Sequence, residues 1–326
     1  MSKNIALCSL AVALSAAVLV LPDATFAQAW PTKPVRIIVP FGPGGGTDIQ
    51  ARVLTTVFQE STGQRFIVEN RAGASGLIGA EIAAGAPPDG YTILFSTATL
   101  TVNTTLYGSL MKTDPVKDLA PISWLTSTPL VLVTHPSVPA KSVKELVAVA
   151  KRRPFFLNSG INVPGSTSHL SAEMLKQMAG IQAIIVPYKG GGPAITALMS
   201  GEIDYLFCTG PVGSAALKTG RVRALAVTTA KKASAFPDLP TMNTFYPGFE
   251  SDNWYAMWFP ANTPRDIVTK MNGLIVKALQ NGKVREFMVN EGLDPVGSTP
   301  EELGTQIKRE IVKYAEVIRK GNIKLQ

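Results

Sequence analysis

The stretch Val35-Arg-Ile-Ile-Val-Pro-Phe-Gly-Pro-Gly-Gly-Gly-Thr-Asp-Ile-Gln50 decides how this chain begins to fold. A β-branched apolar run, typical of a buried strand, ends in a glycine-rich turn, and helical periodicity starts directly after the turn. Thr47 and Gln50 have the spacing of a capping box, which predicts Thr47 as the N-cap of that helix. The first turn of a helix presents unpaired N–H groups and a partial positive charge, so this junction suits an anion.

Residues 41–48 leave three interpretations open. The glycines allow a carboxylate to approach the backbone and bind to it. A dinucleotide fits poorly because Thr47 stands where G-x-G-x-x-G has its third glycine, and no Gly-Lys-Ser/Thr follows for a P-loop. A glycine turn and a capped helix without any ligand explain the same residues. In that case Asp48 only stabilises the first turn of the helix.

The N-terminus has the pattern of a cleavable secretory signal peptide at residues 1–29. Lys3 precedes an apolar core at residues 5–21, and Ala27-Gln-Ala29 supplies a cleavage site before Trp30. The alternative is a retained membrane anchor, but the core is shorter than the span of about 20 residues that a transmembrane helix needs. The sequence therefore predicts export to the periplasm.

Composition limits the class of partner. The chain has 31 basic and 23 acidic residues, a net charge of +8, and the basic residues are read as scattered rather than gathered in blocks. This positive balance favours attraction of small anions, or a general effect of surface charge, over binding of nucleic acid. Cys208 alone remains after leader removal, and the two histidines are His135 and His169, so no metal site and no cofactor are predicted.

Strand and helix patterns alternate through most of the chain, which predicts an α/β protein with largely parallel sheets. Two extended segments, near residues 125–133 and 250–260, flank a block that could form its own sheet. The expected organisation is a first lobe at residues 30–130 plus 251–326 and a second lobe at residues 131–250. The two segments would form a double-strand hinge that lets the lobes close around a ligand.

Polar turns after strands are the candidate binding elements, because ligands of open α/β sheets lie beyond the carboxyl ends of strands. Four such junctions, 41–48, 158–169, 188–193 and 208–214, open into helices, and a hydroxyl-rich connection at 96–103 follows another strand. Residues 158–168 are expected to be a loop.

Individual side chains in these junctions have simpler alternatives. One of the hydroxyls at residues 166–168 is expected to be an N-cap, and His169 either donates to a ligand or fills the first turn. Tyr188 is the better contact candidate beside Lys189. The aromatic run at residues 249–259 is interpreted as hinge and core packing.

Catalytic motifs are poorly represented. The chain has no G-x-S-x-G elbow and no H-E-x-x-H. Cys208 with His169 is the one conceivable nucleophile and base, but Cys208 follows Tyr-Leu-Phe in a strand and is expected to be a buried apolar cysteine. The sequence predicts no enzyme, with an exported hydrolase-like protein as the alternative.

The chain resembles the Bug or TctC-like receptors, the periplasmic solute-binding proteins of tripartite tricarboxylate transporters. The matching segments occur in the order of that family and span nearly the whole chain after the leader. They are Trp30-Pro-Thr-Lys-Pro34, Val39-Pro-Phe-Gly-Pro-Gly-Gly-Gly-Thr-Asp48, Glu69-Asn-Arg-Ala-Gly-Ala-Ser-Gly76, Ala86-Pro-Pro-Asp-Gly-Tyr-Thr-Ile-Leu94, Gly165-Ser-Thr-Ser-His-Leu170, Val186-Pro-Tyr-Lys-Gly-Gly-Gly-Pro-Ala194 and Gly220-Arg-Val-Arg-Ala-Leu-Ala-Val-Thr228.

This resemblance implies a periplasmic binding protein type II fold, with two α/β lobes and a ligand cleft between them. It implies a small carboxylate held by residues 41–48, largely through backbone N–H groups, with loops 96–103, 165–169 and 188–192 completing the pocket. The absence of arginine from these loops favours a modestly charged ligand over a tricarboxylate. The predicted contacts are Phe41, Gly45, Gly46, Thr47, Asp48, Ser96, Thr97, Ser166, Thr167, His169, Tyr188 and Thr209.

The resemblance also implies the partners. A receptor of this family is expected to act as a monomer and to deliver its ligand to the membrane subunits of a tripartite tricarboxylate transporter. Presentation to a membrane sensor is the alternative that the sequence leaves open. The identity of the carboxylate, and the residues at the distal end of the ligand, are not predicted.

Overall fold

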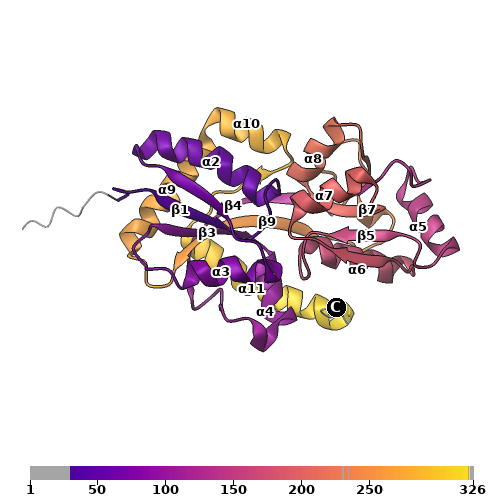
Figure 1. The fold of residues 1–326 in the computed structure, drawn as a ribbon, viewed down its shortest axis with the longest axis horizontal. Helices are drawn as coiled ribbons and strands as arrows, with labels where there is room; N and C mark the ends of the chain where they lie inside the picture. The colour runs from indigo at the N-terminus through magenta and orange to yellow at the C-terminus, as the bar shows by residue number, and fades with distance from the viewer. Residues whose placement is uncertain (1–29, 230, 234, 322, 324–326) are drawn as a thin grey trace, which may run out of the picture.

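The computed structural model describes residues 30–229, 231–233, 235–321 and 323, so the predicted leader at residues 1–29 lies outside the described residues. Figure 1 shows two α/β bodies side by side along the long axis of the molecule, joined through strands β4 and β9. This is the expected α/β class with two sheets, and the two long extended segments of the sequence are among its strands.

The first sheet has the strand order β2-β1-β3-β9-β4. Strand β1 pairs in parallel with β2 and β3, whereas β9 runs antiparallel to both β3 and β4. A short strand, β10, pairs with β4 as well. The strands are β1 (Val35–Val39), β2 (Phe66–Asn70), β3 (Thr92–Thr97), β4 (Leu119–Thr134), β9 (Asp252–Pro260) and β10 (Asp294–Pro295).

The second sheet continues from the same strand β4 in the order β4-β7-β5-β6, and β8 also pairs with β4. Residues 119–129 of β4 pair with β9, and residues 130–134 pair with β7 and β8, so one strand belongs to both sheets. The sheets are mixed rather than largely parallel as expected, because strand propensity carries no information on direction. The strands are β5 (Asn158–Ile161), β6 (Ile184–Pro187), β7 (Tyr205–Thr209) and β8 (Arg223–Val227).

Helices cover both faces of each sheet (Figure 1). Those against the first sheet are α2 (Gly46–Thr62), α3 (Leu77–Ala84), α4 (Thr99–Leu106), α9 (Arg265–Gln280), α10 (Gly282–Asn290) and α11 (Pro300–Gly321). Those of the second body are α5 (Val143–Arg152), α6 (Thr167–Ala179), α7 (Gly191–Ser200) and α8 (Gly210–Lys218). Short 3-10 turns lie at η1 (Ala74–Gly76), η2 (Gly108–Leu110) and η3 (Met242–Thr244).

The strand residues alternate between two apolar layers, which explains the three-layer build. Ile37 and Phe95 pack toward α2 and α9, whereas Ile38 and Leu94 pack toward α3 and α11. This is the period-two alternation of a pleated strand, and both faces are apolar because both are covered. The second sheet repeats the pattern, with its own two clusters drawn from residues 130–249. These clusters are consistent with the predicted lobe boundaries, which we keep as a proposal.

Local predictions were wrong at three places. Gly45, not Thr47, is the N-cap of α2, and the Gln50 amide instead donates to the carbonyl of Gly46. The expected loop at 158–168 contains strand β5, which is short and has only Ile161 as a β-branched residue. The connection at 96–103 contains the start of α4, whose threonines favour a strand by propensity but form a helix here.

Candidate functional site

A pocket lies between the two bodies, where turns from both sheets meet. None of its lining residues carries a charge. They are Phe41, Gly45, Gly46, Thr47, Thr97, Thr99, Asn162, Val163, Ser166, Thr167, Gly190, Gly191, Thr209, Asn253 and Tyr255.

Five helices begin at this pocket: α2, α4, α6, α7 and α8. Four of the five N-cap residues, Gly45, Ala98, Gly190 and Thr209, make no side-chain capping bond. Since the first N–H groups of a helix have no partner within it, a ligand can take the place of the missing caps of α2 and α7. The first N–H groups of α4 and α8 already donate to Thr97 Oγ1 and Thr128 Oγ1. The positive ends of several helix dipoles therefore point at one uncharged cavity, which favours an anion.

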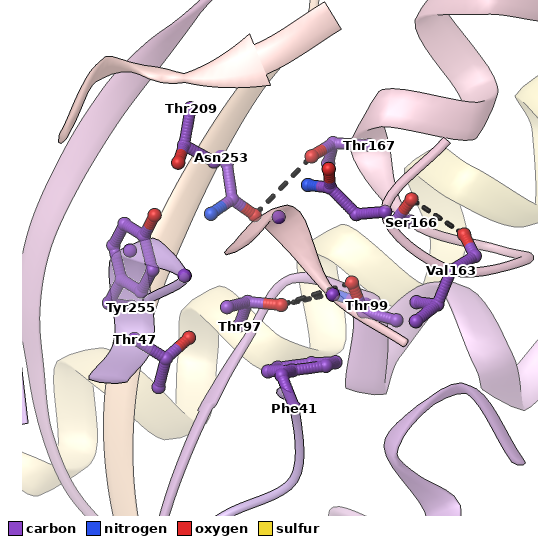
Figure 2. A pocket seen from close by; sticks show the side chains of 15 residues that line it. Phe41, Thr47, Thr97, Thr99, Val163, Ser166, Thr167, Thr209, Asn253 and Tyr255 are labelled. Carbon is purple, nitrogen blue, oxygen red and sulfur yellow. Dashed lines mark hydrogen bonds between the residues drawn. The ribbon is translucent and has the colours of Figure 1, made fainter. Parts of the chain in front are cut away.

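The exception is α6, whose N-cap is satisfied by its own chain. Ser166 accepts from the N–H of His169 at 3.2 Å and donates to the carbonyl of Val163 at 2.7 Å (Figure 2). The predicted N-cap among the hydroxyls at 166–168 is therefore Ser166. Its hydroxyl proton is already used, so the free donors of the pocket lie elsewhere.

Two buried hydroxyls reach the pocket without a partner of their own. In the described structure Thr209 Oγ1 and Tyr255 Oη have no hydrogen-bond partner of standard geometry, although their residues are 6% and 1% exposed. Both oxygens lie against Gly46, where any side chain would overlap the Tyr255 hydroxyl. An unpaired buried hydroxyl is costly, so a ligand atom that accepts from it gains the most.

The Tyr255 phenol is a neutral donor at physiological pH. Burial raises the pKa of Tyr255 to about 12, with Thr209 and Asn253 opposing this rise in part. Thr97, the cross-strand partner of Tyr255, donates to Thr99 Oγ1 at 3.0 Å, and Thr167 Oγ1 lies 3.4 Å from Asn253 Oδ1 (Figure 2). The hydroxyl chemistry of the pocket is thus drawn from both bodies and from strand β9.

Eight of the twelve predicted contacts line this pocket: Phe41, Gly45, Gly46, Thr47, Thr97, Ser166, Thr167 and Thr209. The structure does not place Asp48, Ser96, His169 or Tyr188 in its lining. Ser96 is buried within β3 opposite Ala256. Tyr188 donates to Glu202 at 2.6 Å and faces a different surface groove, beside Pro43 and Pro193.

Asp48 orders the glycine turn rather than facing the pocket. Its carboxylate accepts two bonds from Arg52, at 3.0 and 2.9 Å, and one from the N–H of Gly44 at 3.0 Å. Burial by itself would raise the pKa of Asp48, but the bonds from Arg52 and Gly44 outweigh burial and lower the pKa. A carboxylate so engaged does not repel an anion at the other side of the turn.

His169 has a structural role in the turn before α6. Its Nδ1 accepts from the N–H of Gly165 at 3.1 Å, and Nε2 lies 4.0 Å from Glu173. Burial lowers the pKa of His169, so the imidazole is neutral with its proton on Nε2. His169 therefore occupies the first turn of α6 in a structural role, which was the predicted alternative to ligand contact.

Sequence reasoning missed Asn253 and Tyr255, because the aromatic run around them was interpreted as packing. Trp254 and Trp258 do pack in the core between β9 and α11, at the opposite face of the strand. The spacing of Asn253 and Tyr255, two residues apart, places them on the face that reaches the pocket. The sequence signal for this site was Asn253, an isolated amide side chain within an aromatic strand.

The Cys208 thiol gives no support to an enzyme. Cys208 is fully buried, its thiol donates to the carbonyl of Val131 at 3.6 Å, and burial raises its pKa to about 12. It does not line the pocket, and neither does His169. Among the residues that the structure describes, no cluster of three metal-binding side chains occurs, and no helix is long and apolar enough to cross a bilayer.

Comparisons with known proteins agree with this geometry. Residues 50–323 match the model of the tripartite tricarboxylate transporter family receptor. Protein BugT of Bordetella pertussis is 38% identical over 304 residues, which cover 92% of this chain and 93% of BugT.

Two solved structures are similar over almost their whole length. Rpa4515 of Rhodopseudomonas palustris with adipate has a TM-score of 0.88 at 34% identity, over 90% of this chain and 99% of that one. MatC of the same organism with bound malate has a TM-score of 0.84 at 29% identity, over 89% and 100%. The chain belongs to the tripartite tricarboxylate transporter receptor family, whose members are periplasmic solute-binding proteins of the Bug or TctC type.

Proposed function

We propose that this protein binds a small carboxylate in the pocket and delivers it to the membrane subunits of a tripartite tricarboxylate transporter. The observation that carries the proposal is the convergence of five helix starts and two unpaired hydroxyls, Thr209 and Tyr255, on a cavity without a charged side chain. Backbone N–H groups of α2 and α7 and these hydroxyls hold the ligand oxygens. Adipate and malate in two family members support a carboxylate.

The ligand carries one or two carboxylates rather than three. Each helix start supplies roughly half an elementary charge, and the pocket has no arginine or lysine to balance a larger anion. A carboxylate also needs several donors in one plane to lose its hydration shell without a net cost. The N–H groups of the first turn of α2, together with the hydroxyls of Thr209 and Tyr255, offer such a group for one end of the ligand.

Residues 1–29 export the chain and are removed before Trp30. The protein then acts as a monomeric receptor in the periplasm, where closure of the two lobes holds the ligand. A mass spectrum of the protein purified from the periplasm tests this step by its N-terminal residue.

The experiment that tests the function is calorimetry with a panel of mono-, di- and tricarboxylates, preceded by a thermal-shift screen. A ligand at 100 times its dissociation constant stabilises the folded chain by about 2.7 kcal/mol. We expect a mono- or dicarboxylate to bind and a tricarboxylate to bind at least tenfold more weakly. Binding of neutral compounds alone would overturn the proposal. Transport by the cognate permease, measured in cells lacking the receptor gene, separates delivery to a transporter from presentation to a sensor.

A further inference from the structure

One run of the chain departs from the scattered basic pattern expected from the sequence. Residues 151–156 read Lys-Arg-Arg-Pro-Phe-Phe, and every one of the six is exposed. They form the end of α5 and the turn into β5, at the end of the second body furthest from the first (Figure 1). We name residues 151–156, together with the exposed neighbour Ile184, the basic–aromatic tip.

The apolar side chains of the tip stand in solvent. Phe155 and Phe156 are 60% and 42% exposed, and Ile184 on the edge strand β6 is 46% exposed. The backbone holds these groups together, since Phe155 N–H donates to Gln182 and Ile184 N–H donates to Leu157. Two exposed phenylalanines in one turn are unusual for a surface that meets only water.

The backbone conformation of Phe155 is also unfavourable. Its φ is 59°, in the left-handed region that bulky residues rarely adopt. A glycine or asparagine at this position would relieve the strain, and either would remove the exposed ring. The turn therefore keeps an aromatic side chain where local backbone preference and solvation both disfavour it.

The cations of the tip lack acidic partners. In the described part of the chain, no carboxylate lies within ion-pair distance of Lys151, Arg152 or Arg153, and Arg153 stacks over Phe156 at 3.4 Å from the ring centroid. Three unpaired positive charges beside two aromatic rings complement a surface whose outer layer is anionic and whose inner layer is apolar. The interface of a bilayer with acidic headgroups has this layering.

We propose that the basic–aromatic tip docks reversibly on the anionic phospholipid surface of a membrane. Phe155 and Phe156 enter the boundary between headgroups and acyl chains, and the three cations lie at the level of the lipid phosphates. A stable protein–protein interface takes about 20–30 residues from each side, many more than this tip offers. Lipid docking would keep a receptor near a membrane partner by raising its local concentration.

The test is co-sedimentation of the exported, purified protein with vesicles. Phosphatidylglycerol-containing vesicles are compared with phosphatidylcholine vesicles, at low and at high salt. We expect binding to the anionic vesicles, weaker binding to the neutral ones, and loss at high salt. Each basic side chain near an anionic surface strengthens binding about fivefold, so K151Q/R152Q/R153Q should bind about a hundredfold more weakly.

Matched variants separate docking at this site from general charge. K270Q/K283Q/R285Q removes three exposed cations from α9 and α10 in the first body, and should keep most of the binding. F155S/F156S should lose binding, whereas L110S/V312S, which removes two more exposed apolar groups elsewhere, should keep it. Melting temperatures verify that all four variants are folded.

Equal sedimentation of the two triple variants would overturn the proposal, as would no binding of the wild type to anionic vesicles. If the tip variants bind vesicles like the wild type but fail to support uptake in cells, the tip serves a protein partner and lipid docking is wrong. The vesicle readouts do not depend on the carboxylate ligand, so their outcome is independent of the proposed function.

Discussion

Gly42 donates its backbone N–H to the carbonyl oxygen of Lys189 at 2.7 Å, and this bond joins the β1–α2 turn to the β6–α7 turn beside the pocket. The two turns meet backbone to backbone. A Cβ atom on Gly190 would lie 3.0 Å from the nitrogen of Gly42, and one on Gly192 would overlap the carbonyl of Pro43. Glycines are therefore required here by the approach of the two bodies, in addition to any ligand.

This contact predicts that Gly192→Ala blocks closure without unfolding the protein. Gly192 lies in the first turn of α7, where alanine is a better helix former, so the second body should remain folded. The added methyl group would overlap the carbonyl of Pro43 in the described arrangement of the two bodies. We expect at least a tenfold loss of carboxylate affinity by calorimetry, and a larger radius of gyration with saturating ligand by X-ray scattering.

Gly273→Ala in α9 is the control for the same chemical change. A Cβ at Gly273 meets nothing within 4 Å, so its affinity and scattering should match those of the wild type. Full affinity in Gly192→Ala would show that the contact between the two turns is not needed for binding.

The free hydroxyl of Tyr255 predicts an effect on binding without a loss of stability. Tyr255→Phe removes a donor that has no partner in the described structure, so the melting temperature without ligand should not fall. A hydrogen bond to a charged group is worth about 1.5–3 kcal/mol, which corresponds to a tenfold to hundredfold loss of affinity. Calorimetry and thermal melting measure the two quantities separately.

Tyr205→Phe is the matched control for this hydroxyl. Tyr205 is fully buried in the second body, its hydroxyl is also without a standard partner, and it does not line the pocket. Carboxylate affinity should be unchanged in this variant. A drop of the same size in both variants would mean that the effect comes from altered packing.

Asp252 predicts a pH dependence of stability at the start of β9. Burial raises the pKa of Asp252, Glu310 and Glu250 raise it further, and Lys313 opposes them. An acid whose pKa is raised on folding destabilises the fold once it is ionised, so stability is lost as the pH rises through the folded pKa. Asp252→Asn should therefore raise the melting temperature by a few degrees at neutral pH, and the difference should shrink on acidification.

Asp294→Asn serves as the reference for this pH series. Asp294 is exposed on β10, and its substitution makes the same chemical change there, so the gain of Asp252→Asn at each pH is measured relative to it. A pH-independent gain in Asp252→Asn would assign the effect to packing instead of ionisation.

Two capping patterns show how far local sequence could predict. Thr299 and Glu302 have capping-box spacing and form the box at the start of α11, with Glu302 N–H donating to Thr299 Oγ1 at 3.2 Å and Thr299 N–H donating to Glu302 at 2.8 Å. The same spacing at Thr47 and Gln50 does not cap α2, because Gln50 accepts from the hydroxyl of Thr126 at 2.7 Å. Thr126 lies on β4, far from α2 in the sequence, so the local capping pattern gives no sign of this hydrogen bond to Gln50.

The sequence by itself determined where strands end in glycine and hydroxyl turns, since turn and helix-start chemistry depends on neighbouring residues. It therefore placed most of the pocket-lining turns and the family motifs. Only the tertiary structure decided that Asn253 and Tyr255 face the same cavity and that β4 pairs in both sheets. It also decided that Asp48 and His169 form hydrogen bonds within their own loops. Those outcomes depend on contacts between residues far apart in the chain, where packing and hydrogen-bond competition outweigh local preference.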